Sequence, residues 1–380
     1  MAQRRPIGAG VCGVIYLDYQ ATTPLAPEAF DAMLPWLRDQ HANPHSTHAA
    51  GRKAKAAVEV ARSRIDDHFV AEGDIAFTSG ATEALNWAIK GTQGPIVTLA
   101  TEHAAVLDTV EAERARGRTV TILPVGADGL VDLSVAEAAI GLGTGLVAAM
   151  LVNNEIGIVQ PIAELAELAH RAGALMLCDA VQGFGRVPIP SGCDLVALSA
   201  HKVYGPKGIG ALWLRKGVEL APLLHGGGQE RPGRSGTLSP ALCAGFGEAA
   251  RLLRTEEYPD VRKIDGLWTL ATERLDPYWH INGSTEQRYH GNLNIRRDGL
   301  DVARLMSDLR DIAFSAGSAC ASGSGRSSHV LRAIGLSEAQ ARSSIRLGFG
   351  RYTTEAELTD AIDRIIAAAD AQRIAGGIAA

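Results

Sequence analysis

Apolar runs of strand length alternate with helical patterns along most of this chain. Such runs occupy residues 74–78, 96–99, 146–152 and 195–198, and helical spacing is found between them. This alternation favours an α/β domain, because parallel strands need a crossover between them that is usually helical. We therefore predict a large domain in which helices flank a mainly parallel central sheet.

The pattern changes in the last third of the chain, where long amphipathic helices are interrupted by short strands at residues 292–295 and 345–347. A chain of 380 residues is long enough for one large and one smaller domain, each with its own core. We predict a large domain over residues 14–255 and a smaller α+β domain formed by residues 1–13 and 256–380.

Polar residues follow the predicted strands closely, at the edge where open α/β sheets bind ligands. Lys202 comes shortly after the run 195–198, and Asp179 ends the strand predicted from residue 174. A lysine and an acid placed in this way suit pyridoxal phosphate: the lysine forms a Schiff base, and the aspartate keeps the pyridinium nitrogen protonated. The sequence thus predicts a pyridoxal phosphate enzyme that acts on amino acids.

The turn at residues 79–82 leads into a helix predicted over residues 84–90. Its backbone N–H groups and the Thr82 hydroxyl are suited to a phosphate at the positive end of that helix. The same residues also fit a plain N-cap with Glu83 in the first turn. The lysine and the aspartate together favour the phosphate interpretation.

Three other polar residues each have two interpretations. His103, at a strand end, could stack on the cofactor ring and move protons, or it could be structural. Gln182 could hydrogen-bond the ring hydroxyl, or it could be an ordinary loop residue. Arg346 could hold a substrate carboxylate through two hydrogen bonds, or it could form a surface ion pair.

The five cysteines show no spacing typical of metal ligands, so we predict no metal site. Cys320 differs from the others because it lies among the small residues of 315–325, which neither pack a core nor hold a regular helix well. We expect its thiol to be exposed on a mobile loop, where it can act as a nucleophile. The alternative is a chance cysteine in a flexible turn.

Charge and hydropathy argue against several kinds of partner. The net charge is −5 and no Lys/Arg cluster stands out, which argues against a nucleic-acid-binding surface. No apolar run approaches the roughly 18 residues needed to span a bilayer. The apolar stretch of residues 7–17 follows Arg4 and Arg5 but has no small-residue cleavage site. We therefore expect a strand there rather than a signal peptide, and a cytoplasmic protein.

These segments resemble the NifS/IscS-like cysteine desulfurases, pyridoxal phosphate enzymes of the class V aminotransferase family with the type I fold. The matching stretches keep the family's order from residue 15 to about residue 355. Position 20 departs from the pattern, since it carries Gln where relatives often have a small residue. The matching stretches are residues 16–24, 78–83, 101–103, 152–157, 179–182, 199–202, 225–228, 234–237, 317–320 and 343–346.

The resemblance implies a reaction and the residues that perform it. Lys202 would carry the cofactor and abstract the α-proton of L-cysteine. Cys320 would attack the substrate sulfur to form a persulfide, releasing L-alanine. Asp179 would pair with the ring nitrogen, Gln182 with the ring oxygen, and His103 would stack on the ring. The sulfur would then pass to a protein acceptor, for iron–sulfur cluster assembly or thiolation.

The resemblance also implies how the phosphate and the substrate are held. In a homodimer, one subunit would contribute Thr237 to the phosphate site of the other. Asn154 and Arg346 would bind the substrate carboxylate. The rest of the phosphate site would consist of Ala81, Thr82, Ser199 and His201.

Other functions remain open at this point. A selenocysteine lyase would share the cofactor site and the reaction plan, and an aminotransferase would use Lys202 and Asp179 without needing Cys320. A non-catalytic sulfur-relay or partner-binding protein of the same fold would have no need of the full set of catalytic residues. That set consists of Lys202, Asp179, His103 and Cys320. The chain shows no counterpart of the longer C-terminal tail with which housekeeping members dock the iron–sulfur scaffold, so the sulfur acceptor stays an open question.

Overall fold

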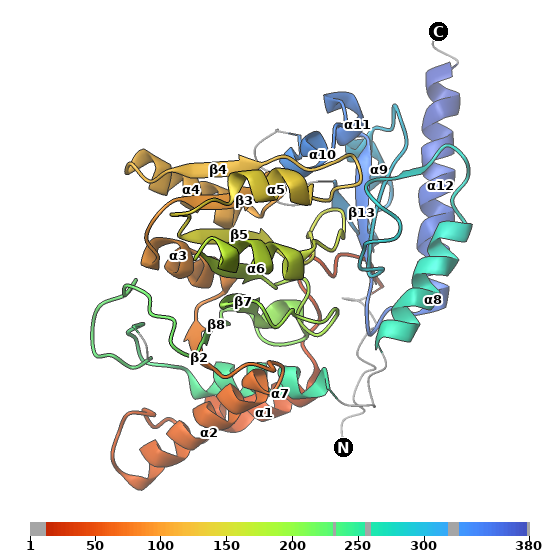
Figure 1. Ribbon diagram of the computed structural model, residues 1–380. Helices are drawn as coiled ribbons and strands as arrows, with labels where there is room; N and C mark the ends of the chain where they lie inside the picture. The colour runs from red at the N-terminus through yellow and green to blue at the C-terminus, as the bar shows by residue number, and fades with distance from the viewer. Residues whose placement is uncertain (1–12, 231–232, 255–259, 318–326, 378–380) are drawn as a thin grey trace.

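The computed structural model describes residues 13–230, 233–254, 260–317 and 327–377, and Figure 1 shows their arrangement. Among these residues, a sheet of seven strands forms the centre of the larger part. Within the described sheet, β8 runs antiparallel to both of its neighbours, and the other pairs are parallel. The strand order is β2 (Gly73–Thr78), β8 (Gly210–Arg215), β7 (Leu195–Ser199), β6 (Leu175–Asp179), β5 (Leu146–Met150), β3 (Ile96–Leu99) and β4 (Val120–Leu123).

Helices cover both faces of this sheet, so the predicted α/β fold with a mainly parallel sheet is confirmed (Figure 1). Along β7, Leu195 and Ala197 pack in one apolar cluster, and Val196 and Leu198 pack in another. A strand buried on both faces is a continuous apolar run, which makes it recognisable in the sequence. One cluster includes α3 (Ala81–Gly91) and α4 (Ala104–Ala115), and the other includes α2 (Ala49–Asp66), α6 (Ile162–Arg171) and α7 (Pro240–Leu252).

Two further helices complete the larger part. α1 (Pro27–Arg38) packs on α7, beside α2, at the β2 end of the sheet (Figure 1). α5 (Leu133–Ala139) packs on α6 and β4. The β2 edge of the sheet is therefore next to a helical layer, and this layer includes α7, which follows the glycine-rich loop at residues 225–237.

Among the described residues, the smaller part contains a four-stranded antiparallel sheet with helices around it (Figure 1). Of the strand expected over residues 7–17, the described residues form only β1 (Ile15–Tyr16), which pairs in parallel with β11 (Ile312–Ala313). The predicted domain boundaries stay a prediction. The four strands are β12 (Ser315–Ala316), β13 (Ser344–Gly348), β10 (Asn292–Arg296) and β9 (His280–Ile281), and the helices are α8 (Asp260–Glu273), α9 (Val302–Asp308), α10 (His329–Ala333), α11 (Glu338–Arg342) and α12 (Glu355–Gly377).

Two helix boundaries differ from the sequence prediction. α3 begins at Ala81 rather than at residue 84, because the Gly80 carbonyl accepts hydrogen bonds from the N–H groups of Glu83 and Ala84 (3.1 and 3.2 Å). The alanine-rich end of the chain predicts a terminal helix over residues 365–380, but α12 begins ten residues earlier, at Glu355. Within the part of the chain that the structure describes, no helix is both long and apolar enough to cross a membrane.

Candidate active site

A cavity of about 560 Å³ lies at the carboxyl ends of β5, β6 and β7. This is the edge at which open α/β sheets bind ligands. The predicted site residues lie far apart in the sequence, and the fold brings most of them to this one space. Those that line the cavity are Ala81, Thr82, His103, Asn154, Asp179, Gln182, Ser199, His201, Lys202 and Arg346.

Lys202 ends a short 3₁₀ turn, η1 (Ala200–Lys202), directly after β7. Its Nζ donates hydrogen bonds to the carbonyl oxygens of Gln20 (2.5 Å) and Ala21 (2.8 Å). Both acceptors lie shortly after β1 and line the same cavity. A primary amine held in this way is placed to form a covalent bond with an aldehyde ligand.

The loop after Lys202 contains a strained residue. Tyr204 has a φ of 65°, in the left-handed region that residues with side chains rarely adopt. Its N–H donates to Thr23 Oγ1 (2.7 Å), its carbonyl accepts from the N–H of Ala26 (2.9 Å), and its hydroxyl accepts from the N–H of Arg351 (2.9 Å). Such strain persists only where the surroundings fix the conformation, and it is common at functional sites.

Asp179 is the last residue of β6 and is only 5% exposed. Its Oδ1 accepts a hydrogen bond from the N–H of Val181 (3.0 Å). Burial raises the pKa of Asp179, while this hydrogen bond, His103 and Lys202 oppose the rise. A cation in front of the carboxylate would favour its ionised form, and a protonated ring nitrogen is such a cation.

His103 caps the N-terminus of α4, because its Nδ1 accepts a hydrogen bond from the N–H of Ala105 (3.0 Å). An accepting Nδ1 carries no proton, so the ring is neutral and its proton is on Nε2. Burial lowers the pKa of His103, which favours this neutral form. The histidine therefore has a structural role in α4 as well as a place in the cavity.

Sequence reasoning missed Glu102, which precedes His103. Its carboxyl group is fully buried, and its Oε1 accepts a hydrogen bond from the N–H of Met150 (2.8 Å). Burial raises the pKa of Glu102 well above its usual range, and the nearby Asp179 adds to this rise. Glu102 thus supports the end of β5 through its hydrogen bond to Met150. The sequence feature that could have identified Glu102 is the position of an acidic residue between an apolar strand and a histidine.

The N-terminus of α3 meets the cavity at Ala81 and Thr82, its first two residues. Gly80 occupies the N-cap position and provides no side-chain cap. An anion in the cavity can therefore interact with the first N–H groups of the helix. Ser199, at the end of β7, and His201, in η1, line the same cavity.

Positive charge dominates the cavity. Lys202, Lys207 and Arg346 line it, and Asp179 is the one carboxylate among the described lining residues. This surplus suits an anionic ligand such as a phosphate ester. The sequence prediction gave no role to Lys207. Its position in the same polar loop as Lys202 is the feature that could have identified it. With a reactive amine, a buried acid and a helix N-terminus, the cavity fits pyridoxal phosphate.

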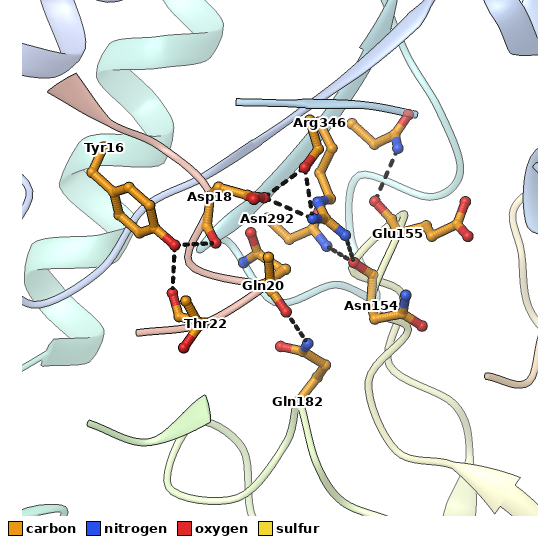
Figure 2. A network of polar contacts seen from close by, with 12 residues as sticks. Tyr16, Asp18, Gln20, Thr22, Asn154, Glu155, Gln182, Asn292 and Arg346 are labelled. Atoms are coloured by element: carbon orange, nitrogen blue, oxygen red, sulfur yellow. Dashed lines mark hydrogen bonds and ion pairs between the residues drawn. The ribbon is translucent and has the colours of Figure 1, made fainter. Parts of the chain in front are cut away.

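Arg346, on β13, reaches the cavity from the smaller part of the chain (Figure 2). Its Nη2 pairs with Asp18 Oδ1 (2.8 Å), and its Nη1 donates to the Asn154 carbonyl (2.9 Å). Ser315 Oγ accepts from Nη2 (3.2 Å) and donates to Asp18 (2.8 Å). The Arg346 side chain is 2% exposed and that of Asp18 is 21% exposed, so this ion pair is partly buried and is not the surface pair considered as the alternative.

Gln20 is the centre of a second set of contacts, of which Figure 2 shows the one with Gln182. Its carbonyl accepts a hydrogen bond from Gln182 Nε2 (2.8 Å) as well as from Lys202. Its side-chain Nε2 donates to the Gly291 carbonyl (2.7 Å), and its Oε1 leaves no room for a Cβ at Gly348. These contacts explain a glutamine at position 20, for which the sequence alone offers no account.

Thr237 and Cys320 are the two predicted residues outside this set. Thr237 is exposed, in the segment before α7, and does not line the cavity of its own chain. Cys320 lies outside the described residues, so its predicted exposure and role stay predictions. The last described residue before it, Gly317, follows β12, in which Ser315 pairs with Arg346. The chain therefore leaves the described part beside the residue predicted to bind the substrate.

Comparison of sequences places this chain among known enzymes. Residues 15–360 match the family model described as Aminotransferase class-V. The cysteine desulfurase IscS of Rickettsia bellii is 43% identical over 368 residues, which cover 92% of this chain and 90% of the relative. The cysteine desulfurase IscS of Rickettsia typhi is 42% identical over 376 residues, which cover 94% and 92%.

Solved structures agree with the sequence relatives. The NifS-like protein from Rickettsia africae has a TM-score of 0.86 at 30% identity, with 94% of this chain and 99% of that chain covered. A structure described as SspA in complex with cysteine has a TM-score of 0.80 at 36% identity, with 89% and 99% covered. The chain therefore belongs to the aminotransferase class-V family and, within it, to the pyridoxal-phosphate-dependent cysteine desulfurases.

Proposed function

We propose that this protein takes the sulfur of L-cysteine, releases L-alanine, and carries the sulfur as a persulfide on Cys320 to a protein acceptor. The observation that carries this proposal is the cavity, in which Lys202 and Asp179 meet at the sheet edge and Arg346 reaches the same space from the smaller part. Relatives named cysteine desulfurase support the reaction. The structure of SspA in complex with cysteine supports the substrate.

Pyridoxal phosphate, when bound, withdraws electrons from the α-carbon of an amino acid. The residues around the cavity would each hold a different part of it. Its phosphate would bind at the N-terminus of α3, with Ser199 and His201 beside it, and Thr237 would come from the second subunit of a homodimer. Asp179 would face the ring nitrogen, and Gln182 would face the ring oxygen.

Lys202 and His103 would move protons in the proposed reaction. The Lys202 amine lies within the cavity, where it can hold the cofactor and then take the proton from the substrate α-carbon. His103, which would stack on the cofactor ring, is neutral because burial lowers its pKa. Since its Nδ1 accepts from Ala105, proton exchange at His103 takes place at Nε2.

Arg346 would bind the substrate carboxylate, and Asn154 would add its side-chain amide. The guanidinium is buried and held by Asp18, which fixes its plane before the substrate arrives. A pre-oriented and poorly solvated guanidinium binds a carboxylate well, because little ordering or desolvation remains to be done. The strands β12 and β13 pair beside Arg346, and Cys320 follows β12 by four positions in the sequence.

The Cys320 thiolate would attack the substrate sulfur. A sulfur–sulfur bond forms as the bond between the sulfur and the substrate β-carbon breaks, and protonation of the carbon fragment gives L-alanine. The persulfide would then pass its outer sulfur to an acceptor protein. Iron–sulfur cluster assembly is a use of this sulfur that fits the relatives named IscS.

The test is to measure L-alanine and sulfide formed from L-cysteine with dithiothreitol as the reductant. We expect Cys320→Ser to keep the cofactor absorbance and to lose activity by a factor of about 100 or more, because the nucleophile is removed while the cofactor site is intact. Cys12→Ser removes a cysteine with no predicted role and should match the wild type. Undiminished sulfide release by Cys320→Ser would contradict the proposal.

A further inference from the structure

Arg186 contacts two residues of the cavity, although the proposed reaction makes no use of it. It lies after β6, and its Nη1 donates a hydrogen bond to Gln182 Oε1 (2.6 Å). Its Nη2 donates to the carbonyl oxygen of Lys202 (2.6 Å). The guanidinium also lies over the ring of Tyr289, 5.2 Å from the ring centroid. One half-buried arginine thus connects the predicted ring-oxygen partner with the backbone of the predicted catalytic lysine.

The contacts of Gln182 determine the orientation of its side-chain amide. A guanidinium has only donors, so the atom that faces Arg186 must be Oε1. A carbonyl oxygen has no hydrogen to donate, so the atom that faces the Gln20 carbonyl must be Nε2, at 2.8 Å (Figure 2). The reversed amide would place NH₂ against the guanidinium and oxygen against the carbonyl. Both contacts would be unfavourable for a side chain as buried as Gln182.

We propose that Arg186 is a positioning residue that fixes the amide of Gln182 so that this side chain presents an N–H to the cavity. Gln182 lines the cavity, and its Nε2 has two hydrogens, of which Gln20 accepts one. The second hydrogen can be donated to a ligand, whose facing atom must be an acceptor such as an anionic ring oxygen. The inference rests on the proposed function, in which Gln182 meets the ring oxygen of pyridoxal phosphate.

Arg186 would act on the cofactor through the charge of that ring oxygen. A hydrogen bond from Gln182 draws negative charge away from the ring oxygen. A proton that the cofactor holds at this oxygen is then bound more weakly and is lost at a lower pH. Without Arg186 only the Gln20 carbonyl holds the amide, so the amide is oriented less firmly and the hydrogen bond from Gln182 to the ligand is lost for part of the time. Removing Arg186 should therefore raise the pH midpoint of the cofactor's absorbance change by about one unit.

The test is a pH titration of the absorbance of the bound cofactor in the holoenzyme. We expect Arg186→Met to raise the midpoint by about one pH unit, and Arg186→Lys, which keeps a donor, to stay near the wild type. Gln182→Glu supplies a second measurement that does not depend on the folding of Arg186→Met. It retains an oxygen for Arg186 but has no N–H to donate, so it should raise the midpoint at least as far.

A double-mutant cycle separates this role from a merely structural one. If Arg186 acts through Gln182, then Arg186→Met should cause no further rise in a Gln182→Ala background. An equal rise in both backgrounds, or no rise in Arg186→Met alone, would overturn the inference and leave the proposed function standing. A wild type with no bound chromophore would contradict the proposed function itself, which the assay of Cys320→Ser tests separately.

Discussion

His201 shows how burial sets the charge of a single side chain in the cavity. Burial lowers the pKa of His201 from 6.5 to about 4, and the neighbouring Lys202 and Lys207 act in the same direction. Its Nδ1 lies 3.1 Å from the hydroxyl oxygen of Thr22. The ring is therefore neutral near pH 7, and the positive charge at this side of the cavity belongs to the two lysines.

We predict that His201 makes the cofactor-free protein less stable in mild acid. Below pH 6.5 the unfolded chain binds a proton at His201, whereas the folded protein does not until about pH 4. The contribution of His201 to the free energy of unfolding therefore falls as the pH drops through this window, and it is constant above pH 6.5. His201→Asn has no such group, so the difference between the two proteins should change by roughly 1–2 kcal/mol, allowing for partial exposure of the ring.

Urea unfolding of wild type and His201→Asn at pH 7 and at pH 4.5 measures this difference. Groups other than His201 titrate in both proteins and cancel in the comparison. The expected result is that the wild type loses more stability than the variant on acidification. An equal loss in the two proteins would show that His201 takes up its proton as readily when folded as when unfolded.

Residues whose role depends on a reactive or charged side chain were predictable from the sequence, and residues whose role depends on backbone groups were not. Lys202 and Asp179 are recognisable because each follows an apolar strand and has a reactive or charged side chain. Gln20 holds Lys202 and Gln182 through its carbonyl, a group that every residue has. Arg186 acts on a glutamine amide and on a carbonyl, and a sequence does not show which of these groups an arginine will face.

At the scale of elements, the contacts of Glu230 and Arg234 hold the glycine-rich loop, to which both residues belong, against the central sheet. The two residues pair through their backbones (2.9 and 3.1 Å). The Glu230 carboxylate accepts from the N–H of Phe77 (2.8 Å) and from both terminal nitrogens of Arg62 (2.9 Å each). Arg234 pairs with Glu83 (2.8 Å) in the first turn of α3. The loop is therefore tied both to β2 and to the helix proposed to bind the phosphate.

Removing the Glu230 carboxylate should destabilise the fold strongly. Phe77 lies on β2, an edge strand, so the carboxylate takes the place of a neighbouring strand. The Glu230 side chain is fully buried, and Glu230→Ala would remove the acceptor of the Phe77 N–H and the buried carboxylate that pairs with Arg62. We expect a loss of about 3–5 kcal/mol in the free energy of unfolding.

Glu59→Ala is the matched control, because Glu59 pairs with the same Arg62 (3.2 Å) but its side chain is 52% exposed. This substitution should change the free energy of unfolding by less than about 1 kcal/mol. Urea unfolding of both variants measures the contrast. Similar small losses in Glu230→Ala and Glu59→Ala would show that the buried carboxylate is not what holds the loop to β2.

Whether a strand or helix could be predicted from the sequence depends on its position in the fold. The central strands β3 and β7 were predictable, because burial on both faces makes them continuous apolar runs. The edge strand β4 was missed, since two of its four residues are exposed and its pattern is mixed. The start of α3 was misplaced because it depends on the Gly80 carbonyl, and periodicity of side chains does not report on backbone hydrogen bonds.

At the scale of the whole molecule, the segment after β1 joins the two parts of the chain around the cavity. Asp18 pairs with Arg346, 328 positions away in the sequence, and Gln20 reaches Gly291. The Thr23 hydroxyl donates to the His201 carbonyl (3.0 Å). Local patterns predict the fold class, but they carry no information on pairings at such separations, so the way these contacts close the cavity could not be foreseen.

Thr237 supports a prediction about the assembled molecule. It is exposed, does not line the cavity of its own chain, and follows the segment that Arg234 ties to α3. If a homodimer brings Thr237 to the phosphate site of its partner, Thr237→Ala should weaken cofactor binding about tenfold, the loss of one hydrogen bond to a charged group. Lys202→Ala should abolish turnover, since the amine that holds the cofactor and moves the α-proton is gone.

Mixed dimers determine which subunit provides the threonine. In a dimer of one Lys202→Ala chain and one Thr237→Ala chain, the working lysine belongs to the Thr237→Ala chain. Under our proposal its Thr237 comes from the other chain, so this site should bind the cofactor with wild-type affinity and give about half of the wild-type activity. If Thr237 acted within its own chain, the same site would bind the cofactor as weakly as the Thr237→Ala homodimer.

The control is a dimer that carries both substitutions on one chain and none on the other. The unchanged chain then keeps its own lysine and threonine but receives no threonine from its partner. It should bind the cofactor weakly if Thr237 acts across the dimer, and normally if Thr237 acts within one chain. Because the two mixed dimers contain the same substitutions and differ only in how these are distributed, opposite affinities in the two would follow from the assembly and not from a general loss of stability.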